Sequence, residues 1–414
     1  MTISSSQESR TDRLVKWATD LRYNDIPDDV VQRTKDFFLD TLGCAIAGRS
    51  HPAVSALVRF AAQMGPSSGN SELVDGSQAL TTSPAFASLI NAAAAHVVEQ
   101  DDLHNRSIMH PKFHTTATGG VIGVAAAVAH LLKLDANQTS SAVGTAGTQA
   151  AGLWQFLMDA THSKQVHTAK ACFDGIFAAY SARDGLLGPR DILEGPRAMG
   201  AALVPGEANP EAIDHNLGTE FAVVRSSFKW HASCRHTHPS VDALLSLMGK
   251  NRVSFDDIDS VLVPTYQAAI NVLSLSGNGD TVHQSKFSMG FVLAIAAKKG
   301  QAMITDFTEA DLKDASLRAF QSRVKMEYNA EIDSQFPERW QGTVVVQCKS
   351  GKTFTESVIF AKGDPELPLT RSEIEAKTHA LAKYGGIKDT NKVDSLIQRA
   401  WNLEHEKDVK GFVF

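Results

Sequence analysis

Nine of the fifteen histidines in this 414-residue chain lie in three short segments. Histidine is the side chain whose unperturbed pKa lies near neutrality, so such grouping is typical of proton transfer, anion binding or metal ligation. The segments contain His96, His104, His110 and His114; then His162 and His167; and finally His231, His236 and His238. Together the three stretches predict one catalytic pocket that the fold assembles.

The first segment mixes histidines with carboxylates. Its members are His96, Glu99, Asp101, Asp102 and His104, followed by His110-Pro111 and Phe113-His114. Acid–base chemistry on a carboxylate substrate needs proton donors and acceptors beside groups that hold negative charge. Two other interpretations stay open: a solvated loop whose acids cap the next helix, and a Zn²⁺ or Fe²⁺ site. There is no HExxH pattern, and Pro111 interrupts the i, i+4 spacing of His110 and His114.

The second and third segments are cationic. In the second, Lys164 lies between His162 and His167, and a lysine near a histidine commonly holds an anionic group; a polar helix start is the alternative. The third has five potentially cationic side chains within ten residues, which would attract a polycarboxylate: Lys229, His231, Arg235, His236 and His238. Cys234 among them is either a thiol nucleophile activated by neighbouring cations or a small core residue. A surface loop with scattered charges is the alternative for the whole segment.

Composition narrows the class of protein. With 43% hydrophobic and 21% charged residues, the chain is typical of a soluble globular protein long enough for two domains. A net charge of −6 argues against binding nucleic acid or an anionic membrane, and the Ala- and Gly-rich stretch 118–132 is too short to span a bilayer. Four scattered cysteines without a CxxC pair, and a polar N-terminus, favour a reducing cytoplasmic location. There is no GxGxxG, Walker A or nucleophile-elbow motif, so nucleotide binding and serine hydrolysis are poorly supported.

Hydrophobic periodicity predicts a mainly α fold. We expect a helical bundle domain (1–223), an inserted α+β domain (224–365) and a C-terminal return to the helices (366–414). Pro27, Asp28 and Asp29 predict the start of a helix that loosens between Gly43 and Gly48. Further helices are expected at 85–98, 119–132, 135–157, 167–183, 240–248, 288–299, 371–384 and 393–403, and strands at 260–264, 343–348 and 353–360, the last two as a hairpin.

Several of these motifs, in order along nearly the whole chain, resemble the MmgE/PrpD family, which includes 2-methylcitrate dehydratase, cis-aconitate decarboxylase and iminodisuccinate epimerase. The matching stretches are 40–44 (DTLGC), 99–104 with His110-Pro111, 163–167 (SKQVH), 192–195 (ILEG), 228–229 with 238–243, 286–289 (KFSM), and 336–340 through 362–365.

The resemblance implies a cofactor-independent enzyme for small di- and tricarboxylates, with a helical bundle, an α/β lid, a pocket between the two domains and usually a homodimer. By position it implies that Glu99 is the first acidic site residue, that His110 and His114 are pocket histidines and that Lys164 and Lys229 are pocket lysines. We therefore predict proton transfer by His110 and His114, with Glu99 or Asp102 orienting a histidine. The predicted substrate-binding residues are His104, Lys164, His167, Lys229 and His238, and no metal is expected.

Three features depart from the family pattern. Glu99 stands where aspartate is common, and Leu103 where threonine is common. Family members also carry a pair of helices between the segments matching His110-Pro111 and Phe113-His114, where this chain has only Lys112. Three hypotheses follow: a lyase that dehydrates or decarboxylates a polycarboxylate, an epimerase or isomerase of a related dicarboxylate such as iminodisuccinate, and a homologue inactivated by loss of those helices.

Overall fold

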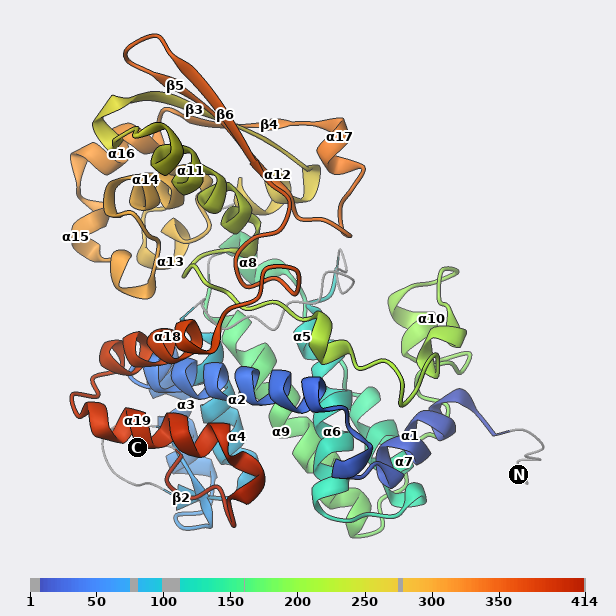
Figure 1. Cartoon of the computed structure of the whole chain (residues 1–414). Coiled ribbons are helices and arrows are strands. Elements are labelled where there is room, and N and C mark those ends of the chain that lie inside the picture. The colour runs from blue at the N-terminus through green and yellow to red at the C-terminus, as the bar shows by residue number, and fades with distance from the viewer. Residues whose placement is uncertain (1–7, 75–80, 99–111, 160, 275–277, 413–414) are drawn as a thin grey trace.

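The computed structural model describes residues 8–74, 81–98, 112–159, 161–274 and 278–412. Its mainly α architecture confirms the predicted fold class. Helices fill the lower half of Figure 1, and a four-stranded sheet with its own helices fills the upper half. The chain passes between the halves near residues 226–235 and again near 360–370 (Figure 1). No helix of the described ranges is long and apolar enough to cross a membrane.

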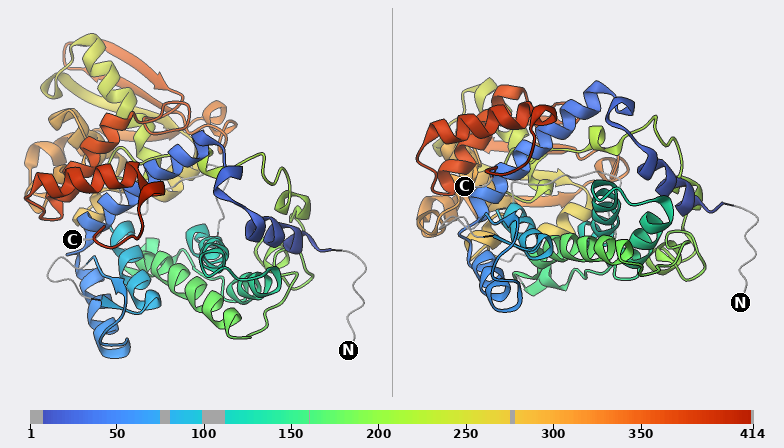
Figure 2. Two further views of the ribbon diagram at one scale, coloured as in Figure 1. Left: turned by 60° about the horizontal axis from the view of Figure 1, so that its bottom comes forward. Right: turned by 90° about the horizontal axis from the view of Figure 1, so that it is seen from below.

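The helical half is built from both ends of the chain. Its helices are α1 (Arg10–Asp20), α2 (Asp28–Gly48), α3 (Pro52–Met64), α4 (Pro84–His96), α5 (Thr115–Thr118), α6 (Gly120–Leu131), α7 (Ala136–Gly147), α8 (Gln155–Asp159), α9 (Ser163–Arg183), α10 (Met199–Leu203), α18 (Arg371–Tyr384) and α19 (Thr390–Trp401). Helix α18 contacts α2, and a buried ion pair of 2.6 Å joins Lys377 Nζ to Asp40 Oδ1. The C-terminal helices thus return to the N-terminal bundle, as Figure 2 shows.

Helix α2 lies very close to α4. The acidic residues Asp28 and Asp29 occupy its first turn, where their negative charges interact favourably with the positive end of the helix dipole. The helix continues through Gly43 to Gly48, so the expected loosening there is wrong. A Cβ on Gly48 would lie 2.0 Å from the carbonyl oxygen of Ala94, and glycine is therefore required for this approach.

Helices α6, α7 and α9 pack against one another through small side chains, and Figure 2 shows them side by side. The two buried clusters between them are mostly alanine: Val121, Ala125, Ala146, Ala171 and Ala178 in one, and Ala129, Leu134, Ala142, Ala179 and Ala182 in the other. A Cβ on Gly175 of α9 would lie 2.7 Å from Val124 Cβ on α6. These helices thus approach closely and bury few large side chains.

The α+β half contains a four-stranded sheet in the order β4-β3-β5-β6. Strands β3 (Ile258–Thr265) and β4 (Val324–Tyr328) are parallel, and β5 (Gly342–Cys348) and β6 (Thr353–Val358) form the predicted antiparallel hairpin. Its helices are α11 (His238–Asn251), α12 (Gln267–Leu273), α13 (Val282–Ser285), α14 (Met289–Lys299), α15 (Glu309–Leu312), α16 (Ala315–Gln321) and α17 (Ala330–Asp333). Helix α11 contacts β5 and β6, and α14 packs beside α11 and β4.

One predicted helix is wrong. The stretch 135–157 forms α7 only to Gly147 and helix again only from Gln155. Between them, Gly152 has a φ of +140°, and Leu153 forms a β-bridge with Phe113. A left-handed φ of this kind interrupts a helix, and the irregular stretch carries aromatic residues to the candidate site.

Candidate active site

The predicted site residues divide into two sets. Glu99, Asp102, His104 and His110 lie outside the described residues. The other five, His114, Lys164, His167, Lys229 and His238, all lie within them, and all but His167 are buried.

His114 and His167 form a directly bonded pair. Their Nδ1 atoms are 3.1 Å apart, so one ring carries the Nδ1 proton and the other accepts it. His114 precedes the short helix α5, and its backbone N–H donates to the carbonyl of Gly152 at 2.9 Å. His167 lies in the second turn of α9. The fold therefore brings His114 of the first histidine segment and His167 of the second into direct contact.

Aromatic rings surround this pair. The centroid of the His114 ring lies 4.8 Å from that of Trp154 and 5.7 Å from that of Phe156, and Phe156 also lies edge-on to His167 at 5.2 Å. His96, at the end of α4, stacks on His114 with centroids 6.0 Å apart. Burial, and then the charge of His96, lowers the pKa of His167 below its usual value. His167 therefore favours its neutral form, which can both accept and donate a proton.

Lys164 lies one helical turn before His167 on α9 and is only 8% exposed. Its Nζ lies 5.6 Å above the ring of Phe287, which belongs to the α+β half. Since residues at i and i+3 share a helix face, Lys164 extends the histidine pair toward the junction of the halves.

The third segment forms a second, deeply buried group. Lys229, His231, Arg235 and His238 are each less than 5% exposed. The guanidinium of Arg235 pairs with the carboxylate of Asp364, which also accepts from Ser227 Oγ at 2.7 Å and from the backbone N–H of Ala361 at 3.0 Å. This ion pair fixes the segment to the second crossing of the chain between the halves.

His238 is held neutral. Its Nε2 donates to the carbonyl of Ser233 at 3.2 Å. Burial, reinforced by the charges of Arg235, His231 and Lys229, lowers its pKa well below the usual value. His238 therefore contributes a neutral ring to this group. The positive charge of the group comes from Lys229 and Arg235.

The remaining two residues of the segment have packing roles. His236 stacks on Trp340 with ring centroids 4.6 Å apart and hydrogen-bonds Tyr266 through Nδ1 at 2.8 Å. Cys234 is buried in the main hydrophobic core, in agreement with its interpretation as a small core residue. The interpretation of this segment as a surface loop is wrong, because its side chains are buried.

Lys286 connects the two groups. Its carbonyl accepts the backbone N–H of Cys234 at 2.8 Å, within the third segment. Its Nζ donates to the carbonyl of Val98 at 2.9 Å, just beyond α4 and its His96. The adjacent Phe287 lies under Lys164. The candidate site therefore lies where the helical half meets the α+β half.

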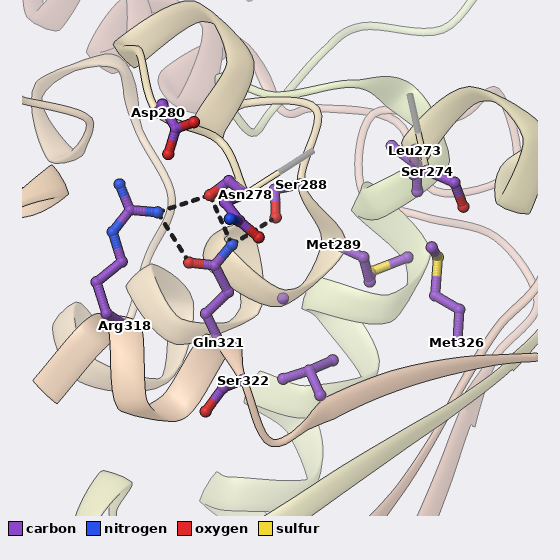
Figure 3. A pocket seen from close by; sticks show the side chains of 12 residues that line it. Leu273, Ser274, Asn278, Asp280, Ser288, Met289, Arg318, Gln321, Ser322 and Met326 are labelled. Carbon is purple, nitrogen blue, oxygen red and sulfur yellow. Dashed lines mark hydrogen bonds between the residues drawn. The ribbon is translucent and has the colours of Figure 1, made fainter. Parts of the chain in front are cut away.

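A cavity of about 600 Å³ beside the sheet has none of these histidines in its lining (Figure 3). It is lined by residues of α12, α14, α16 and β4, including Arg318 and Gln321. Figure 3 shows both side chains hydrogen-bonded to Asn278, and Arg318 donates further to the carbonyls of Gly279 and Leu312. Because these donors already serve the backbone, we do not assign chemistry to this cavity.

Some residues near the site were not predicted from the sequence. Trp154 and Phe156 wall the histidine pair, and Asp242 binds His231. Only Asp242 had a usable signal, since it lies four residues after His238 at the start of a predicted helix and so on the same face. Among the described residues, no group of three His, Cys, Asp or Glu side chains is arranged to hold a metal ion.

The protein consists of a helical bundle formed by both chain ends and an α+β half. Buried histidines and lysines lie at the junction of the two halves, and this arrangement is typical of an enzyme. Family models match almost throughout: the MmgE/PrpD N-terminal domain at residues 12–112 and 110–211, and the MmgE/PrpD C-terminal domain at 231–403. The chain belongs to the MmgE/PrpD family. The N-terminal match is in two pieces that meet at residues 110–112, where the sequence predicts that a family segment is absent.

Similar proteins cover the chain from end to end. The cis-aconitate decarboxylase-like protein oryM of Aspergillus oryzae is 25% identical over 481 positions, covering 99% of this chain and 97% of its own. Cis-aconitate decarboxylase of Homo sapiens is 25% identical, covering 94% and 90%, and that of Aspergillus terreus is 23% identical, covering 98% and 95%. These alignments are longer than the 414 residues of this chain, so the relatives contain residues without a counterpart here.

Proposed function

We propose that this protein is a lyase for small tricarboxylates, with cis-aconitate as the first substrate to test and 2-methylcitrate as the second. The observation that carries the proposal is the bonded pair His114–His167, with Lys164 one turn away, in a chain similar over its whole length to cis-aconitate decarboxylases. These relatives support a lyase of the decarboxylase or dehydratase type, and the pair supplies a proton donor and acceptor.

Two lysines would hold the substrate carboxylates. Lys164 comes from the helical half and Lys229 from the segment that enters the α+β half, and both are at least 90% buried. A charge shielded from water interacts more strongly with a bound carboxylate than an exposed one does. Two cations on opposite sides of the junction favour a substrate with at least two carboxylates.

Decarboxylation in this site would require one proton from the protein. The bond between carbon and the departing carboxylate breaks, its electron pair stays on the substrate and CO₂ leaves. The electron pair is stabilised by conjugation with the double bond and a remaining carboxylate held by a lysine. The His114–His167 pair then donates a proton to carbon, and solvent restores that proton.

Dehydration would use the same groups in a different order. A base removes the proton next to a carboxylate, the electron pair forms the new double bond, and the hydroxyl leaves as water with a proton from an acid. A histidine pair that shares one proton can supply either function, because one ring donates the proton at Nδ1 and the other accepts it.

The resemblance also implies that the chain works as a homodimer in the cytoplasm, without a metal or organic cofactor. Several large apolar side chains of the helical half are exposed, including Leu131, Phe177 and Leu187, and a partner copy would cover such residues. Light scattering coupled to gel filtration tests this state, and a mass of one chain would contradict it.

Proton NMR of purified protein with cis-aconitate, 2-methylcitrate, citrate and iminodisuccinate, with and without EDTA, tests the proposal. We expect itaconate from cis-aconitate or an alkene from a hydroxy acid, at a rate that EDTA does not change. Stereochemical inversion without loss of CO₂ or water would identify an epimerase instead. A folded protein silent on all four acids would contradict the lyase and support the homologue inactivated at residues 110–112.

A further inference from the structure

His231 and Asp242 form a buried pair beside His238 that the predicted site did not include. His231 Nε2 lies 2.9 Å from Asp242 Oδ1, and the other carboxylate oxygen accepts the backbone N–H of Lys362 at 2.7 Å. Asp242 is thus fixed from two sides, and it fixes the ring of His231 in turn. The partner of Nε2 is a carboxylate, so Nε2 carries a proton and Nδ1 is the nitrogen left to exchange one.

The free nitrogen of His231 faces a buried, cationic setting. His231 is 2% exposed, and its Nδ1 has no hydrogen-bond partner within the part of the chain that the structure describes. The same holds for Nδ1 of His238, whose ring centroid is 5.1 Å from that of His231. Nitrogens of this kind are usually satisfied in proteins, so two unsatisfied ones side by side indicate that a ligand or water completes the site.

We propose that His231, oriented by Asp242, is a further proton-transfer residue of this site and exchanges a proton with the substrate through Nδ1. The inference rests on the proposed function. In dehydration, a substrate C–H bond breaks, an N–H bond forms at Nδ1, and the electron pair stays on the substrate to form the double bond as water leaves. The His114–His167 pair protonates the leaving hydroxyl.

Charged and titratable groups face His231 from two elements. Lys229, Arg235 and His238 lie on its own segment and at the start of α11, and Asp242 lies one turn further on. A carboxylate bonded to one imidazole nitrogen stabilises the cation that forms when the other nitrogen gains a proton. Lys229, which is 2% exposed, would bind the substrate carboxylate whose neighbouring carbon loses the proton.

Two substitutions separate a proton-transfer role from a structural one. In Asp242→Asn the side-chain NH₂ faces Nε2 and reverses the hydrogen bond, so His231 carries its proton on Nδ1 in the same geometry. In His231→Gln the side-chain amide N–H takes the position of the Nε2–H group and keeps the hydrogen bond to Asp242. The substitution removes Nδ1, the nitrogen that would exchange a proton. We expect each to lower kcat at least about 100-fold and to change the pH profile of kcat, with KM and the unfolding midpoint nearly unchanged.

A matched surface pair serves as control. His379 Nε2 lies 3.0 Å from Asp394 Oδ1, with side chains 37% and 60% exposed, so Asp394→Asn reverses the same kind of bond away from the site. We expect no change in kcat for this variant. A loss of activity in Asp242→Asn and His231→Gln that only follows a lower unfolding midpoint, or an unchanged pH profile, would overturn the proposal.

Proton uptake distinguishes failure of this inference from failure of the proposed function. If no acid is turned over, the proposed function falls. Calorimetry in two buffers of different ionisation enthalpy then measures the protons taken up when propane-1,2,3-tricarboxylate binds at pH 7. We expect the wild type to take up more protons than His231→Gln; equal uptake, or no binding, would overturn the inference.

Discussion

The two halves of this protein position their histidines by different physical means. In the helical half, Ala- and Gly-rich helices approach closely, and His114 and His167 are held by each other and by aromatic rings. At the entry to the α+β half, buried charges and hydrogen bonds do this work, through Arg235–Asp364 and His231–Asp242. Two histidines therefore share a proton in the helical half. At the entry to the α+β half, His238 is kept neutral and His231 is oriented by a carboxylate.

The largest effect on turnover should come from replacing one of the two histidines that share a proton in the helical half. His114→Asn leaves a polar side chain without an acid–base nitrogen, and we expect turnover to fall roughly 100- to 10,000-fold. Steady-state kinetics on the substrate found by NMR measures this. His130→Asn on the exposed face of α6 is the control. Turnover within threefold of wild type in His114→Asn would remove this pair from the chemistry.

Breaking the buried ion pair should destabilise the α+β side. Asp364→Asn leaves the Arg235 guanidinium buried without its anion, which costs about 3–5 kcal/mol of unfolding free energy. Urea unfolding measures it. Asp184→Asn, in an exposed pair with Arg183, should leave the midpoint nearly unchanged. Equal midpoints for the two variants would contradict a structural role for the Arg235–Asp364 pair.

Lowering the pH should reduce the stability of the protein mainly through the buried histidine at the entry to the α+β half. His238 stays neutral in the folded chain because its pKa is lowered, whereas the unfolded chain binds the proton near pH 6.5. The unfolded state then holds more protons, so stability falls by about 1.4 kcal/mol per pH unit for this residue as pH drops below about 6.5. His238→Asn should reduce that slope, and an unchanged slope would show that another group titrates.

The close approach of helices α2 and α4 offers a test of packing in the helical half. In Gly48→Ala the new methyl meets the carbonyl of Ala94, and overpacking of this kind costs about 1–3 kcal/mol. Gly123→Ala on α6 meets nothing within 4 Å and should stabilise by about 0.5–1 kcal/mol through helix propensity. Thermal unfolding compares them, and the same sign of shift in both would contradict the packing argument.

Periodicity and helix signals in the sequence predicted most of the fold. Helix α18 and the hairpin β5–β6 follow directly from local pattern and turn residues. The helix expected at 135–157 ends at Gly147 and is followed by an irregular stretch that contains the positive φ of Gly152, which local pattern does not reveal. Strand β4 was missed because its residues carry charges and its pairing to β3 spans about sixty residues.

The sequence indicated the residue types of the candidate site, whose role stays a prediction, but it did not indicate their bonding partners. The grouping of histidines indicated His114, His167 and His238, since proton carriers cluster at sites. The bond between His114 and His167 and the neutral state of His238 depend on contacts between distant segments. Burial determined by the tertiary fold cannot be derived from local sequence.

The central claim is that both halves hold one polycarboxylate, and binding of propane-1,2,3-tricarboxylate tests it most directly. This acid has no hydroxyl or double bond, so it should bind without reacting. Calorimetry should show at least about 10-fold weaker binding for Lys164→Met and for Lys229→Met, because each removes one charged hydrogen bond. Lys250→Met, at an exposed ion pair with Glu356, is the control and should bind normally. Normal binding by a folded Lys229→Met, with loss only in Lys164→Met, would contradict a shared site.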